Sequence, residues 1–334
     1  MGWVNLIFVF VAALVVTALL ARIAARLRLV AVPGEHRHHQ APTPMVGGLG
    51  IFAGLALGIL CWSPANMGLL ACLAILCFVG MLDDQITLPS WSRFVVQGGV
   101  AYLMIELTGV RLESLGFLAS ADHEVELGAW STAMTVFATI GVINAVNMSD
   151  GMDGLAGSLV ALSLAVLLFI TNTSVNLIWI SIASVLGFLV FNLRIGRAQA
   201  KVFMGDAGST MLGFLLAYLL IQASQQRAGF PPAVALWVLA LPLIDAVSVL
   251  IVRPLRGRSP FDADRVHYHH IILDRGLSVN QTLALILAIQ ILCAVAGVWM
   301  FRFGIQEHLI LLLFLVVFAF YLIALYRYTG LKTQ

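Results

Sequence analysis

Charged residues are scarce in this sequence. Asp, Glu, Lys and Arg make up 10% of its 334 residues, whereas apolar residues make up 61%. Soluble domains carry about 25% charged and about 45–50% apolar residues. Because so little charge cannot cover the apolar surface in water, a soluble fold is excluded and a lipid bilayer is the expected solvent. The net charge of +2 gives no bias towards nucleic acid, which is not an expected partner.

Cysteine is also rare. The four cysteines, Cys61, Cys72, Cys77 and Cys293, lie in apolar runs, and no two of them form a Cys-x-x-Cys pair. We therefore interpret them as small apolar side chains, and neither a disulfide framework nor thiolate-bound zinc is expected. Lys and Arg are missing before the apolar run that begins at Trp3, whereas a secretory signal needs positive charge there. That run is expected to be a retained first span.

Long apolar stretches dominate what is present. A transmembrane helix needs about 20 mainly apolar residues to cross about 30 Å of hydrocarbon. The sequence predicts an all-α, polytopic membrane bundle that forms a single domain over residues 1–334. Its eleven predicted spans are 3–22, 46–62, 67–82, 93–108, 130–147, 155–171, 176–192, 207–223, 234–252, 281–301 and 308–326. Pro242 is expected to kink the ninth span and open a lateral groove for a lipid tail.

The positive charges are distributed unevenly between the predicted loops. With the N-terminus outside and the C-terminus inside, fifteen of the eighteen Lys and Arg residues fall in inside segments. Cytoplasmic segments of membrane proteins carry this excess, so the distribution supports both the orientation and the count of eleven spans. In the outside segment 109–129, the alternating runs 110–113 and 124–127 predict a small external β-hairpin.

Polar residues gather in five segments at the inside ends of predicted spans. Ionisable groups near a membrane span are costly and tend to be functional. The segments are 36–48, 83–84, 144–154, 203–209 and 264–270.

The third segment has a regular spacing. Asn144, Asn147, Asp150 and Asp153 recur every three residues, which aligns them on one helical face until two glycines loosen the backbone. A plain polar loop needs no such spacing, although hydrogen bonds between helices would also explain the two asparagines.

The second and fourth segments offer further carboxylates. The Asp83-Asp84 pair is either functional or a solvated end of a helix. Asp206 lies between two glycines at a predicted helix start, where backbone N–H groups bind phosphate and the helix dipole favours an anion. An N-cap role is the alternative for Asp206.

The fifth segment holds three histidines in four positions, His267, His269 and His270, beside arginines. The histidines suggest zinc at first, but neighbouring cations favour an anion. Carboxylate and amide oxygens without thiolates suit Mg²⁺, and Arg with His suits a polyanionic substrate. The residues alone predict a Mg²⁺-dependent enzyme that acts on phosphates at the inside face, with a lipid as an expected substrate.

These segments resemble those of the polyprenyl-phosphate N-acetylhexosamine-1-phosphate transferases over nearly the whole chain, most specifically at 144–155 and 202–209. The run 267–270, preceded by 259–261 and 264–265, is similar to the undecaprenyl-phosphate GlcNAc-1-phosphate transferase branch, as are the eleven spans. The alternative branch is the phospho-MurNAc-pentapeptide transferase of peptidoglycan synthesis, which has three consecutive histidines and ten spans.

The resemblance implies a reaction and its partners. N-acetylhexosamine-1-phosphate, GlcNAc-1-phosphate in this branch, would pass from a UDP-sugar to undecaprenyl phosphate with release of UMP. Mg²⁺ would be the cofactor, with Mn²⁺ as an expected substitute. The active site would lie on the cytoplasmic face of a bacterial inner membrane, at the first membrane step of O-antigen or related cell-envelope glycan synthesis. If the chain assembles, a homodimer is expected.

The resemblance also implies residue roles. Asp206 and Asn147 would bind the metal, and Asp83, Asp84, Asp150 and Asp153 would be catalytic. The substrate-binding set would be Asn144, Gly205, Ser209, Arg265, His267, His269 and His270, together with His39, which matches a family histidine without a defined role. Asp245 lies within the ninth span, where the branch also has an acid, and an ion pair with Arg253 is its structural alternative.

Two mechanisms and one further class of function are compatible with these residues. Direct attack by the lipid phosphate is favoured, because Mg²⁺ and the basic loop would stabilise the charge without an enzyme nucleophile. Attack by an Asp first, with a covalent intermediate, is the alternative. An ion-coupled secondary transporter would place its acids near the midplane, often between internal repeats. Here the acids lie mainly at one face, and no repeat is detected.

Overall fold

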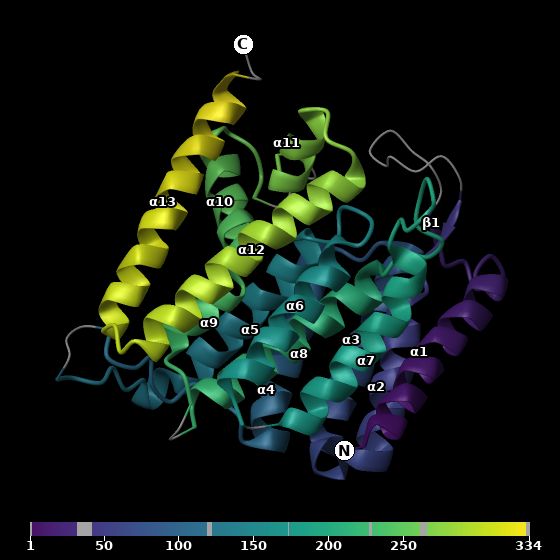
Figure 1. The fold of residues 1–334 in the computed structure, drawn as a ribbon, viewed down its shortest axis with the longest axis horizontal. Coiled ribbons are helices and arrows are strands. Elements are labelled where there is room, and N and C mark those ends of the chain that lie inside the picture. Colours follow the sequence, from purple (N-terminus) through teal and green to yellow (C-terminus); the bar gives the residue numbers. More distant parts are fainter. Residues whose placement is uncertain are drawn as a thin grey trace. The chain divides into compact units, whose positions relative to one another are not determined.

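The regular structure of the protein is almost entirely helical. The computed structural model describes residues 2–31, 42–118, 122–172, 174–226, 229–260 and 266–331, and within them the elements are helices apart from two short strands (Figure 1). The chain divides into two compact units, Met1–Val110 with Thr135–Leu219, and Arg111–Met134 with Leu220–Gln334.

The first unit contains most of the sequence motifs. Its elements are α1 (Trp3–Ile23), β1 (Val30–Ala31), β2 (Thr43–Pro44), α2 (Gly47–Trp62), η1 (Pro64–Asn66), α3 (Met67–Ile86), α4 (Ser90–Thr108), α6 (Leu155–Ile170), α7 (Val175–Asn192) and most of α5 (Ser131–Met148) and α8 (Gly205–Ser224). The second unit contains η2 (Gly128–Trp130), α9 (Pro232–Val238), α10 (Ala240–Leu255), α11 (Tyr268–Asp274), α12 (Val279–Arg302) and α13 (Glu307–Leu331).

The helices confirm an all-α, multi-pass membrane protein. In the described part of the chain, seven helices are long and apolar enough to cross a bilayer, and eight if α9 and α10 form one bent span. The apolar helices α2 and α6 are shorter. Each of the eleven predicted spans coincides with a helix or with the α9–α10 pair. The number of crossings, their orientation and the single domain stay predictions.

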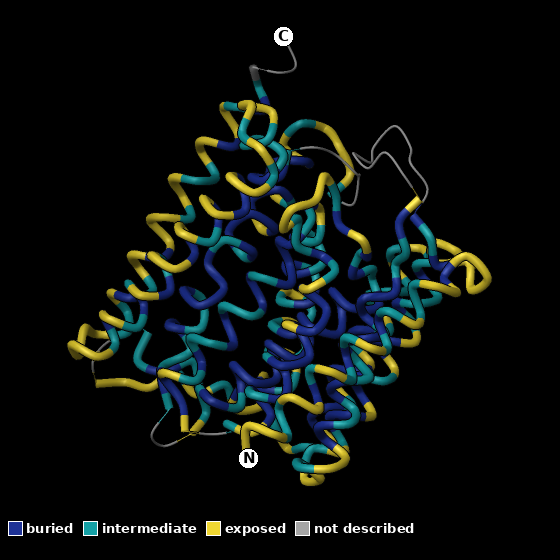
Figure 2. Tube along the Cα trace, turned by 45° about the vertical axis from the view of Figure 1, so that its right-hand side comes forward, coloured by how far each residue is buried: buried dark blue, intermediate teal, exposed yellow. Residues whose placement is uncertain are grey.

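Burial differs sharply among these helices. The apolar window of α8 is 89% buried, whereas those of α1 and α13 are 17% buried. Figure 2 shows α13, which leads to the C-terminus, mostly in the colours of exposed and intermediate residues. Its exposed side chains include the apolar Leu312 and Phe320. Such surfaces on α1 and α13 are suited to lipid rather than water.

The predicted external hairpin is not confirmed as a pair of strands. Ser114 and Glu126 form a single antiparallel bridge, with backbone hydrogen bonds from Leu115 N–H to Val125 O, from Val125 N–H to Gly116 O and from Leu127 N–H to Glu113 O beside it. Side chains bind the competing backbone groups: Gln225 Oε1 accepts the N–H groups of Glu113 and Ser114 at 2.9 and 3.0 Å. These two N–H groups are therefore not available for a regular ladder. The two described strands, β1 and β2, pair antiparallel in the first unit instead.

The ninth predicted span is broken. α9 and α10 meet at Leu239 with a bend of 88°. Pro242 explains the position of the break, because proline has no N–H to donate to the carbonyl four residues earlier and its ring clashes with that carbonyl. The expected kink at Pro242 is thus found as a much sharper bend.

One side chain of a neighbouring helix satisfies the backbone at this break. Gln290 of α12 is buried, accepts a hydrogen bond from Leu241 N–H at 2.9 Å, and donates to the carbonyls of Trp237 and Val238 at 3.2 and 2.9 Å. Unbonded backbone groups in an apolar medium cost several kcal/mol each. Gln290 therefore stabilises the bend by bonding these backbone groups.

Replacing Gln290 by Leu is expected to destabilise the protein by about 3 kcal/mol, since three backbone groups at the bend lose the hydrogen bond that Gln290 makes. Thermal unfolding of the purified protein in detergent measures the loss. Leu292→Ala, at a position of α12 that is 68% exposed, is the matched control and should unfold almost as the wild type does. Equal unfolding temperatures for the two variants would show that Gln290 does not support the bend.

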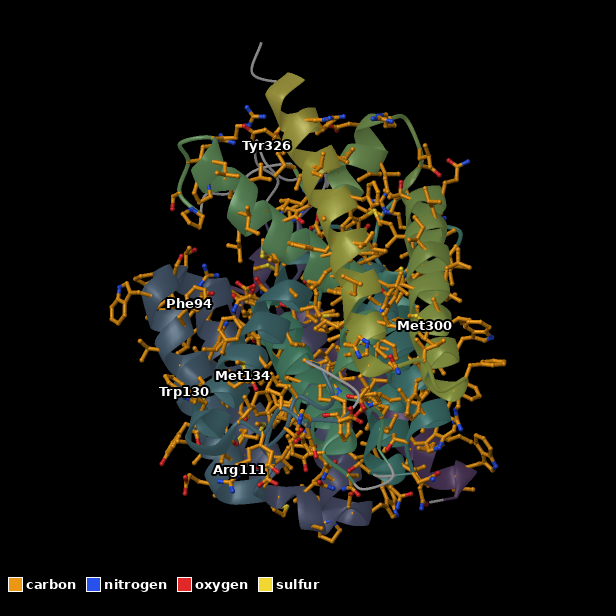
Figure 3. All side chains as sticks on the ribbon, turned by 90° about the vertical axis from the view of Figure 1, so that its left-hand side faces the viewer. Phe94, Arg111, Trp130, Met134, Met300 and Tyr326 are labelled. Carbon is orange, nitrogen blue, oxygen red and sulfur yellow. The ribbon has the colours of Figure 1, made fainter. Side chains whose placement is uncertain are left out.

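A second interaction joins α10 to α13. The guanidinium of Arg256 lies over the ring of Tyr326, 4.1 Å from its centroid, and donates to the carbonyl of Tyr326 at 2.6 Å. Figure 3 labels Tyr326 on α13. This stacked and hydrogen-bonded pair holds the ends of the two helices together within the second unit.

Candidate active site

The first and fourth polar segments lie side by side in the first unit. Phe203 N–H donates to Pro44 O at 2.8 Å, Gly47 N–H donates to Phe203 O at 3.0 Å, and Gly48 N–H donates to Met204 O at 2.9 Å. These backbone bonds join the start of α2 to the start of α8. The described part of the first segment, 42–48, therefore anchors the helix that carries Asp206.

The start of α8 lies against glycines of two other helices. A Cβ atom at Gly48 of α2 would lie 2.2 Å from Gly208 N, and one at Gly80 of α3 would lie 2.5 Å from Ala207 Cα. Such distances are far inside van der Waals contact, and the atoms met are backbone. Only glycine permits this approach, so both positions fix where Asp206 sits.

Asp84 binds the start of α8. Its Oδ1 accepts the N–H of Asp206 at 2.9 Å, and its Oδ2 accepts the N–H of Ala207 at 3.3 Å. A carboxylate at this place also meets the favourable end of the helix dipole. The backbone donors that the sequence assigns to a substrate phosphate are thus bonded to Asp84, and Asp206 is not the capping residue. Gly205, with a φ of +74°, makes the turn into the helix.

Asp83 has different partners from its neighbour. Its Oδ1 accepts Leu88 N–H at 2.6 Å, and its Oδ2 accepts a bond from Arg93 Nη1 at 3.2 Å. Arg93, on α4, is a site residue that the sequence reasoning missed, because it was counted only as an inside positive charge. Its position ten residues after an acid, across a short linker, is the signal that would have found it.

Asn147 and Asp206 are in direct contact. The amide nitrogen of Asn147, on α5, donates to Asp206 Oδ1 at 2.6 Å and to Ser209 Oγ at 2.9 Å. The amide carbonyl of Asn147 and the second oxygen of Asp206 are the hard donors at this point. The two residues assigned to the metal are therefore neighbours, as are Ser209 and Gly205 on the same turn, where Ser209 Oγ donates to Gly205 O.

Asp150 follows the end of α5 and adds negative charge to this cluster. Its pKa is raised well above the ordinary value by burial and by the charges of Asp206, Asp84 and Asp153. Carboxylates this close repel one another unless a cation or a proton offsets the charge. The cluster is therefore of a kind that a bound divalent cation would stabilise.

Asp153 is held in a structural network. Its Oδ2 accepts Arg194 Nε at 2.6 Å and Ala200 N–H at 2.8 Å. Beside it, Asn192 Oδ1 accepts Gly154 N–H at 2.8 Å, and its Nδ2 donates to Val202 O at 2.9 Å. Asp153 and Asn192 thus tie the turn after α5 to the segment that leads into α8. Sequence reasoning missed Asn192 and Arg194.

Asn144 bonds to another helix. Its amide nitrogen donates to Gln97 Oε1 of α4 and to Ile140 O, both at 2.8 Å. This is the bond between helices that the sequence allowed as an alternative. The role of Asn144 in binding substrate stays a prediction.

The histidines of the fifth segment lie in the second unit. His267 Nδ1 is 2.6 Å from Asp245 Oδ2, and its ring stacks on that of His269, which is tilted against His270. His269 is completely buried, and both its ring nitrogens are without a partner among the described residues. Burial, with the charges of His270 and His267, lowers the pKa of His269 well below its usual value. His39 and Arg265 lie outside the described residues.

The oxygen-rich cluster fits Mg²⁺ better than zinc. Among the described residues, no group of three or more His, Cys, Asp or Glu side chains is arranged to hold a metal ion alone. Mg²⁺ seldom needs such a cage, because it binds through one or two carboxylates and completes its shell with substrate phosphates and water. Asp206, with Asn147 beside it and the repulsion felt by Asp150, matches that pattern.

Comparison with known proteins finds relatives that share one name. Residues 66–224 match the family described as "Glycosyl transferase family 4". A protein of Yersinia pestis is 36% identical over 95% of this chain and 89% of its own length, and one of Escherichia coli (strain K12) is 36% identical over 90% and 84%. A protein of Haemophilus influenzae is 33% identical over 93% of the chain and 90% of its own length. All three are named "Undecaprenyl-phosphate alpha-N-acetylglucosaminyl 1-phosphate transferase".

Proposed function

We propose a reaction for this chain from the premise that it belongs to glycosyl transferase family 4: it transfers GlcNAc-1-phosphate from UDP-GlcNAc to undecaprenyl phosphate and releases UMP. Membership rests on relatives that are 36% identical over 95% of the chain, and it confirms the resemblance found from the motifs. The acceptor and the sugar are taken from the names of those relatives.

The observation that carries the proposal is the acid cluster at the start of α8. Asn147 contacts Asp206 at 2.6 Å, Asp84 binds the backbone of Asp206, and burial together with the charges of both carboxylates raises the pKa of Asp150. Phosphoryl transfer depends mainly on positioning and on neutralising charge. A cluster of hard oxygen donors held in place by these hydrogen bonds meets both needs.

The residues divide into three roles under this proposal. Asp206, with the carbonyl of Asn147, would hold Mg²⁺, with Mn²⁺ as a substitute, and the ion would neutralise charge on the diphosphate. Asp83 and Asp84 lie at the end of α3, where they would orient the lipid phosphate. The histidines of the fifth segment, with Arg265, would bind the diphosphate or the sugar.

Asp150 and Asp153 act differently from one another in the proposed site. Asp150, whose pKa is raised by burial and by the charges of Asp206 and Asp84, would shape the metal and nucleotide site directly. Asp153 is already bonded to Arg194 and Ala200, so it would act by holding the turn that carries Asp150.

The membrane setting of the reaction is also part of the proposal. Eleven spans, an outside N-terminus and an inside C-terminus would place the cluster on the cytoplasmic face of a bacterial inner membrane, where UDP-sugars are available. The product would serve the first membrane step of O-antigen or related cell-envelope glycan synthesis. The positive charges of the inside segments support this orientation.

Feeding the purified enzyme separately with UDP-GlcNAc and with UDP-MurNAc-pentapeptide, each with undecaprenyl phosphate and Mg²⁺, tests the proposal. We expect UMP and a glycolipid only from UDP-GlcNAc. Product only from UDP-MurNAc-pentapeptide would assign the chain to the peptidoglycan branch. Solute uptake by reconstituted vesicles without any UMP would indicate a transporter.

Leaving out undecaprenyl phosphate in the same assay separates the two mechanisms. Direct attack by the lipid phosphate, which we propose, releases no UMP without the acceptor. A burst of UMP equal to the amount of enzyme would instead indicate a covalent phospho-sugar intermediate on an Asp.

A further inference from the structure

A buried carboxylate in the second unit gathers donors from three parts of the chain. Asp245, on α10, is 3% exposed. Its Oδ2 contacts His267 Nδ1 at 2.6 Å, and its Oδ1 accepts the N–H of Tyr268 at 3.1 Å and the hydroxyl of Tyr321 on α13. The carboxylate therefore binds both the first residues of the histidine segment and a separate helix.

These bonds define the state of His267. An ionised carboxylate only accepts hydrogen bonds, so the contact with Asp245 favours the tautomer of His267 in which Nδ1 carries the proton. The other ring nitrogen, Nε2, is then the one left for a ligand, and the plane of the ring is fixed. Carboxylates orient metal-binding histidines in this way in other proteins, and loss of the orienting group there typically costs about 10–100-fold in metal affinity or activity.

The ring of His267 contacts other rings of the same segment, so its orientation affects theirs. Its ring stacks on His269 with 5.7 Å between centroids and an angle of 11°, and His269 lies 4.2 Å from His270. Tyr268, whose N–H is bonded to Asp245, also packs edge-on against His269. Rotation of His267 would therefore disturb the whole row of rings.

We propose that Asp245 is a positioning residue that fixes the tautomer and ring plane of His267, and through it the histidine row that contacts the nucleotide-sugar diphosphate. This inference rests on the proposed function, because the histidines are assigned to the diphosphate there. Tyr321 supports the carboxylate from α13. Asp245, which is 3% exposed, would act through His267 rather than on the substrate.

A double-mutant cycle tests whether Asp245 acts through His267. Asp245→Asn keeps the size of the side chain and an acceptor for Tyr268 and Tyr321, but it turns an amide N–H group towards His267 Nδ1 and favours the other tautomer. We expect this variant to raise KM for UDP-GlcNAc, to lower kcat/KM for that substrate by about 10–100-fold, and to leave KM for undecaprenyl phosphate unchanged. His267→Gln should lower kcat/KM for UDP-GlcNAc at least as much.

The decisive variant is the double mutant. If Asp245 works through His267, Asp245→Asn has no further effect once His267 is Gln, so the double mutant equals His267→Gln alone. If the losses in kcat/KM of the two single variants multiplied in the double mutant, the inference would be overturned. A loss confined to kcat, with KM for both substrates unchanged, would also overturn it. Since KM does not depend on the folded fraction, partial misfolding does not imitate the expected result.

Ser248→Ala provides the matched control. Ser248 lies one turn from Asp245 on α10, is fully buried, and its hydroxyl has no partner among the described residues. This variant should behave as the wild type does. If Asp245→Asn does not accumulate in the membrane, Tyr321→Phe takes its place in the cycle, with the same non-additivity expected. A wild type that releases no UMP would overturn the proposed function, whereas an active wild type with an additive cycle overturns only the role of Asp245.

Discussion

Replacing Asp206 by Asn is expected to lower the rate of UMP release by at least about a thousandfold, because metal-stabilised phosphate charge contributes several kcal/mol to such reactions. The amide keeps the oxygen that accepts the bond from Asn147, so the fold should survive while the negative charge is lost. UMP release at saturating concentrations of both substrates, over a range of Mg²⁺ concentrations, measures the effect.

The far end of the same helix supplies the control for this variant. Ser224→Ala removes a hydroxyl that donates to Ile221 O in its own last turn, and it should leave UMP release unchanged. Thermal unfolding in detergent should be similar for Ser224→Ala, Asp206→Asn and the wild type. Near-normal turnover by a folded Asp206→Asn enzyme would show that Asp206 is not a metal ligand.

Gly80→Ala is expected to reduce UMP release by about a hundredfold, because a displacement of reacting groups by about 1 Å has that cost. The new methyl group would overlap the backbone of Ala207, 2.5 Å away, and of Asp206, 2.6 Å away. Backbone atoms at a helix start cannot rotate aside, so α8 must shift and carry Asp206 with it. The same assay of UMP release measures the loss.

A glycine on α4 separates this displacement from the general effect of adding a methyl group. A Cβ atom at Gly99 would meet nothing within 4 Å, so Gly99→Ala should retain full activity and gain slightly in stability from helix propensity. If Gly80→Ala and Gly99→Ala had the same activity, the close approach of α3 to α8 would not position the site.

The sequence predicted the helices and most of the acid cluster for a clear physical reason. Membrane helices need continuous apolar runs, and the places where these runs end show where polar groups emerge. Asn147, Asp150 and Asp206 lie at such ends, and their residue types and spacing alone indicate a phosphate site. The contact between Asn147 and Asp206 follows from helices that end close together.

Hydrogen bonds and ion pairs between residues distant in the sequence could not be predicted in the same way. Asn192 and Arg194 lie among residues that also explain membrane orientation or helix ends, so nothing in their spacing marks the bonds to Gly154 and Asp153. Asp245 is another case, because the sequence offered Arg253 as its partner, whereas the structure bonds it to His267, Tyr268 and Tyr321. Pairings of this kind depend on tertiary packing.

The hydrogen bonds of Gln290 impose an order on how this protein is built. The backbone groups freed at the bend between α9 and α10 find their partner on α12, which is synthesised later. Until residue 290 has been synthesised, the earlier segment lacks those bonds. The 88° turn can therefore gain this support only when α12 docks against it.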